Sequence, residues 1–253
     1  MKLVLKYGGT SISNTKNIHT ICKHVSTLSK KHQIAIVCSA TSGTTDDLIE
    51  ISESIKKENK SKAEQLASKI INRHNQLAKQ TIKKSDIQKK LLVKLNEDFT
   101  ELLALIDGLV LLGEVTSRSM DYLISFGERL SIKLIAAAIN DLSKKSISLT
   151  GKEVGIVTDS NFGESKPLMD TTRLRVSKSI DELFWQEYDV WGSGIFLEEN
   201  TYNSICDALA SEVSNMFREL FGEDDAYNLQ DIDGFDMDYA FKQAAEFDSK
   251  IYN

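Results

Sequence analysis

The sequence predicts an α/β fold with a parallel sheet over residues 1–180, followed by a mostly helical, acidic segment over residues 181–253. Two observations predict the sheet. Short apolar runs end in turns of small residues, and each turn is followed by helical periodicity. A third observation, an abrupt change in charge and aromatic content near Asp181, predicts the boundary between the two segments.

The first apolar run lies at residues 3–5 and leads into the turn KYGGTS at residues 6–11. An apolar run that enters a glycine turn is typical of a buried strand. Apolar residues then recur at helical spacing over residues 14–31, which predicts a helix directly after the turn.

This first turn has the composition of an anion site. Gly8 and Gly9 allow backbone N–H groups to approach an anion closely, and the following helix adds the positive end of its dipole. Lys6 adds a mobile cation. The hydroxyl donors of the turn are Thr10 and Ser11. The turn therefore predicts a site for phosphate, or for a carboxylate that is being phosphorylated, although a Gly-Gly pair after a strand is also common in plain turns.

The same pattern follows a second time. An apolar run at residues 34–38 ends in the small-residue loop SATSGTTD at residues 39–46, and a helix is expected over residues 46–57. In a parallel α/β sheet, ligands bind beyond the carboxyl ends of the strands. Both small-residue loops lie there, so we expect Gly8 and Ser39 to come close together.

The remaining part of the first segment adds further elements. Residues 50–106 are helical and rich in lysine, which indicates a solvated helix face rather than a nucleic-acid surface. An apolar helix is expected over residues 132–139 and a third strand over residues 146–150. A polar loop is expected over residues 160–166.

Charge and aromatic content divide the chain. Residues 181–253 carry 18 acidic and three basic side chains, whereas residues 1–180 carry 19 acidic and 28 basic ones. The balances are −15 and +9, although the whole chain has a net charge of only −6. Only five of the 19 aromatic residues precede Asp181. This split predicts two segments of different character.

The composition also excludes some classes of protein. The three cysteines, Cys22, Cys38 and Cys206, are far apart and odd in number, which argues against a disulfide framework and favours a cytoplasmic setting. No apolar run approaches the ~20 residues that span a bilayer, and the N-terminus has no signal-peptide pattern. We expect neither a membrane nor a nucleic acid as partner.

Four motifs occur in order along the first segment: KYGGTS at 6–11, SATSGTTD at 39–46, SFGERLS at 125–131 and TDSNFGE at 158–164. In this order and spacing they resemble aspartate kinase (aspartokinase), a member of the amino-acid kinase superfamily. The resemblance covers about residues 1–180. It implies a parallel-sheet, amino-acid-kinase-like sandwich for this segment.

The resemblance also implies an activity. Aspartate kinases transfer the γ-phosphoryl group of ATP to the side-chain carboxylate of L-aspartate, the first step toward lysine, threonine and methionine. The implied ligands are L-aspartate and ATP, with Mg²⁺ carried by the nucleotide and no metal site of the protein's own. Family members commonly form dimers, so a homodimer is possible.

Site residues carry over where the motifs match. Lys6 corresponds to the lysine expected to contact the transferring phosphoryl group. The residues implied to bind phosphate are Gly8, Gly9, Thr10 and Ser11. The residues implied to bind the aspartate substrate are Ser39, Thr45 and Glu128, the last through the substrate's α-ammonium group.

Structural alternatives remain open for two of these residues. Glu128 could pair instead with Arg129 or Arg118, and Thr45 could simply cap a helix that starts at Asp46. Many family members also place an arginine just before the fourth motif. This sequence offers only Lys152 nearby, and a lysine lacks the bidentate fork of a guanidinium.

The family pattern is not recognisable after about residue 181. The glycine-rich G-R-G-G-S-D loop and the W-T-D-x-D-G segment expected for nucleotide binding are not found, and residues 190–196 contain glycine without either motif. Residues 205–220 instead carry apolar positions at helical spacing. The alternative function is therefore a catalytically inactive or truncated aspartokinase-like protein whose acidic C-terminal segment binds a basic partner.

Overall fold

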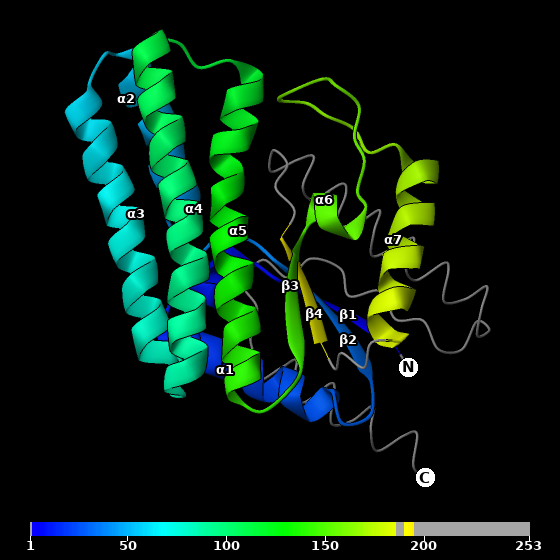
Figure 1. Ribbon diagram of the computed structural model, residues 1–253. Helices are drawn as coiled ribbons and strands as arrows, with labels where there is room; N and C mark the ends of the chain where they lie inside the picture. Colours follow the sequence, from blue (N-terminus) through cyan, green and yellow to red (C-terminus); the bar gives the residue numbers. More distant parts are fainter. Residues whose placement is uncertain (1, 186–189, 195–253) are drawn as a thin grey trace. The chain divides into compact units, whose positions relative to one another are not determined.

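The computed structural model describes residues 2–185 and 190–194 (Figure 1). The chain divides into two compact units, Met1–Cys206 and Asp207–Asn253, and all of the described residues belong to the first. The helix predicted over residues 205–220 and the acidic segment beyond it lie outside the described residues.

The described elements alternate between strands and helices, as the sequence predicts. In chain order they are β1 (Lys2–Tyr7), the 3-10 turn η1 (Gly9–Ile12), α1 (Thr15–Leu28), β2 (Gln33–Cys38), α2 (Thr44–Lys56), α3 (Lys60–Thr81), α4 (Ser85–Leu112), α5 (Ser117–Asp141), β3 (Ser146–Thr150), α6 (Gly151–Val154), α7 (Met169–Trp185) and β4 (Val190–Gly194).

The four strands form one parallel sheet in the order β1-β2-β4-β3. Strands β1 and β2 pair over their whole length, from Lys2 opposite Gln33 to Tyr7 opposite Cys38. The predicted parallel α/β sheet and its three predicted strands are therefore confirmed. Strand β4 was not predicted, yet it lies between β2 and β3 and completes the described sheet.

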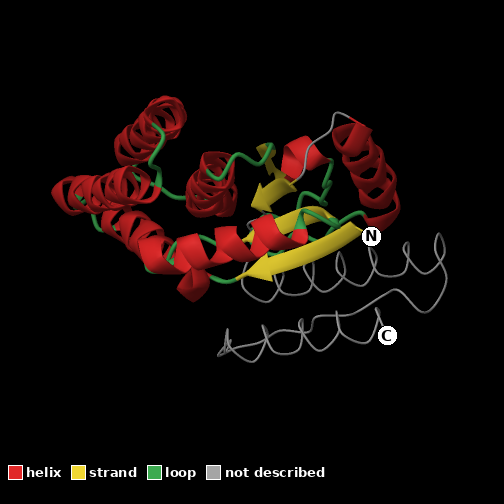
Figure 2. Cartoon of the chain, turned by 90° about the horizontal axis from the view of Figure 1, so that it is seen from below, coloured by secondary structure: helices red, strands yellow, loops and turns green. Residues whose placement is uncertain are grey.

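Both faces of this sheet are buried, as expected for parallel strands. On β2, Ile34 and Ile36 belong to the larger hydrophobic core, which the helices α1 to α5 share. Ala35 points into a second, smaller core that contains Val154 of α6 and Val176 of α7. Figures 1 and 2 show the sheet between these two groups of helices.

Helices α2, α3, α4 and α5 pack in sequence order, each against the next (Figure 1). The apolar helix expected over residues 132–139 is the C-terminal part of the much longer α5, which begins after Thr116. The side chain of Thr116 accepts a hydrogen bond from the Ser119 N–H and caps the helix. The two middle motifs are therefore carried by one loop and by one long helix.

A buried ion cluster joins α4 to α5. Asp98 on α4 is 2% exposed, and its carboxylate pairs with Arg129 at 2.7 Å and with Lys133. Arg129 also pairs with Glu101 and lies 4.3 Å from the ring centroid of Phe126. Removing one partner of a buried pair is costly because the other charge stays buried, so this cluster fixes α5 against its neighbour.

The change of composition at Asp181 falls within α7, which continues to Trp185 and is followed by β4 in the same sheet. The division of the chain into domains 1–180 and 181–253 stays a prediction, because residues 195–253 lie outside the described part.

Helix α5 approaches the loop after β2 closely at Gly127. A Cβ atom added at Gly127 would lie 2.7 Å from the Cβ of Ala40 and 3.7 Å from a methyl group of Leu48. Gly127 is fully enclosed in the helix interior, where glycine otherwise costs stability relative to alanine. The contact, rather than helix propensity, explains the glycine.

We predict that Gly127→Ala lowers the free energy of unfolding by ~1–3 kcal/mol, because the new methyl group overpacks the contact with Ala40. Gly108→Ala on α4 is the matched control, since a Cβ there meets nothing within 4 Å. The control should raise the free energy by ~0.5–1 kcal/mol through helix propensity. Chemical denaturation monitored by circular dichroism measures both, and equal effects of the two substitutions would contradict the prediction.

Candidate active site

The first two small-residue loops meet at the carboxyl ends of β1 and β2. The Ser39 N–H donates to the Tyr7 carbonyl oxygen at 3.0 Å, just beyond the last paired residues of the two strands. A Cβ added at Gly9 would lie 2.9 Å from the Ala40 carbonyl oxygen. The expected proximity of the two loops is therefore confirmed, and Gly9 is needed for the approach of the two backbones.

Two backbone amides of the first turn have no acceptor among the described residues. Lys6 is exposed at the end of β1, opposite Val37 in the sheet register. Within the described part of the chain, the N–H groups of Gly8 and Gly9 donate to no other residue. Thr10 is exposed and Ser11 is half-buried. The turn has the free amides and hydroxyls that an anion site requires.

The helix predicted near Asn14 is confirmed, because α1 starts at Thr15 with Asn14 as its cap. The 3-10 turn η1, which lies between the glycines and this helix, was not predicted. Asn17 of α1 donates to the Thr10 carbonyl oxygen at 3.2 Å and ties the helix to the turn.

Glu128 is the most unusual group at this edge of the sheet. Its side chain extends from α5, and the residue is 4% exposed. Oε1 accepts a hydrogen bond from the Ala40 N–H at 3.0 Å, whereas Oε2 is buried and has no hydrogen-bond partner among the described residues. The alternative pairing with Arg129 or Arg118 is wrong. Arg129 pairs with Asp98 and Glu101 of α4, and Arg118 stacks on Phe162 at 5.4 Å.

Burial controls the charge of this carboxyl group. Loss of hydration raises the pKa of Glu128 to about 8, and the Ala40 amide offsets only part of this effect. A buried carboxylate with one bare oxygen is costly. A cationic group placed beside Oε2 would favour the ionised form and remove that cost.

Two further residues of the third motif hold the loop after β2. The Ser131 hydroxyl lies 2.7 Å from the Ser39 carbonyl oxygen and 3.0 Å from that of Glu128. Gly127 allows the close approach described above. Sequence reasoning assigned no role to either residue. The spacing of Gly127, Glu128 and Ser131 on one helix face was the available signal.

Thr45 lies half-buried in the first turn of α2. It does not cap that helix, so the alternative role as N-cap is wrong. The cap position is held by Gly43, which has a positive φ of 73°. The structure thus places Ser39 and Thr45 at the two ends of one short loop, with Glu128 against its backbone.

The fourth motif, at residues 158–164, folds against the first turns of α5. The Gly163 N–H donates to Oδ2 of Asp121 at 2.9 Å, and Arg118 lies over the Phe162 ring. Asp121 and Glu128 are seven residues apart on α5, which places them on one face of the helix. Sequence reasoning missed Asp121, although it lies only four residues before the third motif. Helix α5 therefore organises the second and the fourth motif together.

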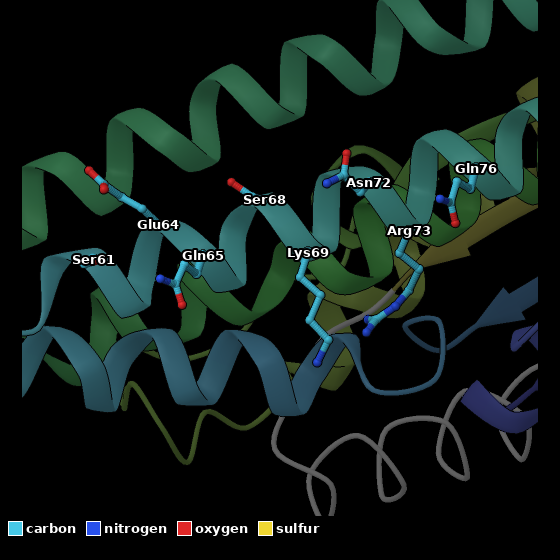
Figure 3. A pocket seen from close by; sticks show the side chains of 8 residues that line it. All are labelled: Ser61, Glu64, Gln65, Ser68, Lys69, Asn72, Arg73 and Gln76. Atoms are coloured by element: carbon cyan, nitrogen blue, oxygen red, sulfur yellow. The ribbon is translucent and has the colours of Figure 1, made fainter.

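A groove of about 740 Å³ lies elsewhere, along the outer face of α3 (Figure 3). Its polar lining includes Lys69, Asn72, Arg73 and Gln76 but none of the predicted site residues. The convergence of motifs at the strand ends, rather than this groove, marks the candidate site.

The described residues contain no group of three or more His, Cys, Asp or Glu side chains arranged to hold a metal ion. No helix among them has the length and apolar character required to cross a membrane.

Comparisons with known proteins point to one family. The model of the amino acid kinase family matches residues 1–190, which extends past the limit of about 180 set by the four motifs. Aspartokinase 1, chloroplastic, of Arabidopsis thaliana is 29% identical over 191 residues, which cover 74% of this chain and 31% of that protein. The aspartokinase of Corynebacterium glutamicum is 24% identical over 181 residues, covering 71% of this chain and 30% of that protein.

Solved structures agree in fold. Aspartokinase III of E. coli, in complex with lysine and aspartate, superimposes with a TM-score of 0.71 at 16% identity, covering 83% of this chain and 46% of that chain. The aspartate kinase of Clostridium acetobutylicum gives a TM-score of 0.59 at 13% identity, covering 84% and 46%. The predicted resemblance and fold class are confirmed. The chain spans less than a third of the length of the two curated relatives.

The buried carboxyl group generates a pH-dependent prediction. Because the pKa of Glu128 is about 8 in the folded chain and 4.5 ordinarily, the unfolded chain releases this proton at lower pH. The resulting contribution to stability is fully present below pH 4.5 and is lost as the pH rises toward 8. Glu128→Gln keeps an oxygen for the Ala40 amide but cannot ionise. We expect its melting temperature to exceed that of the wild type increasingly from pH 5 to pH 8, by roughly 2–8 °C at the upper end.

The control for this measurement is Glu97→Gln, because Glu97 is exposed on α4. Its melting temperature should follow that of the wild type across the same pH range. A constant difference between Glu128→Gln and wild type would show that the carboxyl group does not titrate between the folded and unfolded chains as expected.

Proposed function

The chain belongs to the amino acid kinase family, and from this premise we propose that it is an aspartate kinase. The reaction transfers the γ-phosphoryl group of ATP to the side-chain carboxylate of L-aspartate, the first step toward lysine, threonine and methionine. The similarity to aspartokinases supports the choice of substrate. The observation that carries the proposal is the state of Glu128, which lies beside the loop that contains Ser39. Its Oε2 is buried and lacks a partner among the described residues.

An amino-acid substrate fits this carboxyl group. The α-ammonium group of aspartate would donate to Oε2 and favour the ionised form of Glu128, at a position where the protein supplies no donor of its own among the described residues. Ser39 and Thr45, at the ends of the adjacent loop, offer hydroxyl groups for the polar atoms of the substrate.

The glycine turn at residues 6–11 is suited to bind the phosphates of the nucleotide. Gly8 and Gly9 present amides that no other described residue uses, and Lys6 provides a cation at the end of the neighbouring strand. Thr10 and Ser11 add hydroxyl groups. These groups would bind the phosphates of ATP and neutralise charge as it moves onto the leaving oxygen.

The chemistry requires little beyond alignment. The side-chain carboxylate of aspartate has an ordinary pKa of ~3.9 and is already ionised at neutral pH, so no general base is needed. One carboxylate oxygen forms a bond to the γ-phosphorus while the bond from that phosphorus to the bridging oxygen of ADP breaks. Mg²⁺ carried by the nucleotide would supply further charge neutralisation. The role of Lys6 and the turn is to hold the two reactants in line.

A cytoplasmic location and a homodimer accompany this proposal. The first rests on the small number of cysteines, of which Cys22 and Cys38 are free and buried in the described structure. The second rests only on the family resemblance.

A second candidate function follows from the charge of the chain. With a balance of −15, residues 181–253 are suited to a basic partner, and no nucleotide-binding motif of the family is found in them. In this case the chain would bind aspartate without transferring phosphate. It would associate with the basic partner in a salt-sensitive manner.

Hydroxamate trapping tests the transfer reaction directly. Purified chain, aspartate, Mg-ATP and hydroxylamine should yield aspartyl hydroxamate, and Lys6→Ala should lower the rate by ~100-fold or more because it removes a cation from the transferring phosphate. Lys23→Ala, which removes an exposed lysine from α1, is the control and should leave the rate unchanged.

Aspartate binding is measured separately by thermal shift. At saturating aspartate the melting temperature should rise by ~5–10 °C, and Glu128→Gln should abolish most of this rise. A rise without hydroxamate would favour the second candidate function. If no hydroxamate forms and the melting temperature does not rise, the assignment of aspartate as the ligand is contradicted.

A further inference from the structure

A chain of hydrogen bonds joins the loop after β2 to helix α3. His74 of α3 is completely buried, with an exposed fraction of 0%. Its Nε2 lies 3.1 Å from Oγ1 of Thr41, and its Nδ1 lies 2.8 Å from the Ile70 carbonyl oxygen. Both ring nitrogens therefore have a partner, one in the loop and one in the backbone of α3.

The protonation of His74 follows from these partners. A carbonyl oxygen can only accept, so Nδ1 carries the hydrogen and donates to Ile70. Burial lowers the pKa of His74 to about 4, so the ring is neutral at physiological pH and Nε2 accepts. The Thr41 hydroxyl must therefore donate its hydrogen to His74.

The donor in each of the next hydrogen bonds, from Thr41 back to Arg73, is fixed in the same way. Thr41 has used its only hydrogen, so the Thr44 hydroxyl, 2.7 Å away, donates to Thr41. Arg73 in turn donates to Oγ1 of Thr44 at 2.9 Å. The chain of donors runs from Arg73 through Thr44 and Thr41 to His74. It begins at a group that can only donate and ends at a carbonyl that can only accept, so its polarity cannot reverse.

Arg73, the first donor of this hydrogen-bond network, is itself held in place by Asp47. Arg73 donates to Oδ2 of Asp47 at 2.7 Å, and Lys69 donates to the other carboxylate oxygen at 2.7 Å. Asp47 is 4% exposed and belongs to α2. Figure 3 shows Lys69 and Arg73 extending to the same side of α3, where they line the polar groove.

The loop between Ser39 and Thr45 is thus fastened from two helices. On α5, Ser131 and Glu128 bind its first residues. On α3, His74 and Arg73 bind the hydroxyl groups in its middle and at its end. The two hydroxyl groups and the imidazole ring of this network each donate their one hydrogen to a defined acceptor, which fixes the direction of every bond between them.

We propose that His74 is a positioning residue of the site. Together with Arg73 it holds Thr41 and Thr44, and it thereby fixes the loop in the conformation in which Ser39 and Thr45 hold the amino-acid substrate. The inference deepens the proposed function and rests on it for the identity of the substrate. Among the described residues, His74 forms hydrogen bonds only with Thr41 of the loop and with the Ile70 carbonyl of its own helix, so it acts through Thr41.

Apolar packing alone would not require this arrangement. A buried imidazole and two buried threonine hydroxyls cost free energy unless all are paired, and apolar side chains could fill the same volume. Gly43 adapts the backbone to this hydrogen-bond network, because its positive φ turns the loop into α2 next to Arg73. A Cβ added at Gly43 would lie 3.7 Å from the Arg73 guanidinium. The polar contacts select one loop conformation, where an apolar contact would be non-directional.

The test uses a matched pair at Thr41 in the full chain. Thr41→Val keeps the shape of the side chain but leaves Nε2 of His74 and the Thr44 hydroxyl without their partner. Thr41→Ser keeps the hydroxyl. Hydrogen–deuterium exchange is measured at the hydrogen-bonded amides of Ser39, Ala40 and Thr44, well below the melting temperature. The aspartate dissociation constant is measured by calorimetry.

We expect Thr41→Val to accelerate exchange at these amides by roughly tenfold or more and to weaken aspartate binding by roughly tenfold. Thr41→Ser should remain within about twofold of wild type in both measurements. If Thr41→Val does not fold, His74→Leu serves instead and is read in the same way, because it removes the ring nitrogen that accepts the Thr41 hydrogen bond. Unchanged exchange in the valine variant would overturn the inference, as would faster exchange with unchanged aspartate affinity.

Failure of the proposed function has a different outcome. If the wild-type chain does not bind aspartate, the assignment of the ligand fails. The exchange rates then decide by themselves whether His74 and Thr41 fix the loop. Faster exchange limited to the valine variant would keep the positioning role, whereas equal exchange in both variants would end it.

Discussion

The contact between α5 and the loop after β2 is the constraint on which the site depends. Gly127 has no side chain, so the helix can approach Ala40 closely enough for the next residue, Glu128, to accept a hydrogen bond from the Ala40 amide. Any larger side chain at Gly127 would separate the two backbones. The carboxyl group would then lose the Ala40 amide, its hydrogen-bond donor among the described residues.

This contact leaves Glu128 half satisfied, and the structure around it limits how the remaining oxygen can be satisfied. Burial keeps water away, and Arg129 is committed to the carboxylates of Asp98 and Glu101 on α4. A buried carboxylate is unfavourable while one of its oxygens is unpaired, and it becomes favourable when a cation pairs with that oxygen. Such a group suits a binding site, because removal of the cost of the unpaired oxygen contributes to the free energy of ligand binding. The ion cluster between α4 and α5 holds the helix against its neighbour, while Oε2 of Glu128 has no partner among the described residues.

Much of this organisation could be predicted from the sequence. Apolar runs at residues 3–5 and 34–38 indicated two buried strands, and the rule that ligands bind at their carboxyl ends placed Gly8 near Ser39. Strand β4 was missed because residues 190–194 are rich in glycine and lack the alternation of a strand. Its place is set by β2 on one side and β3 on the other rather than by its own propensity.

The sequence by itself determined the α/β class, the parallel sheet and the two loops that meet at its edge, because periodicity and small-residue turns are local properties of the chain. Only the tertiary structure decided the partners of the polar groups. The hydrogen bonds that Thr41 donates to His74 and Gly163 donates to Asp121 join residues that are 33 and 42 positions apart. No local pattern records such pairs, since they arise when packed helices bring buried donors and acceptors together that must be satisfied in place.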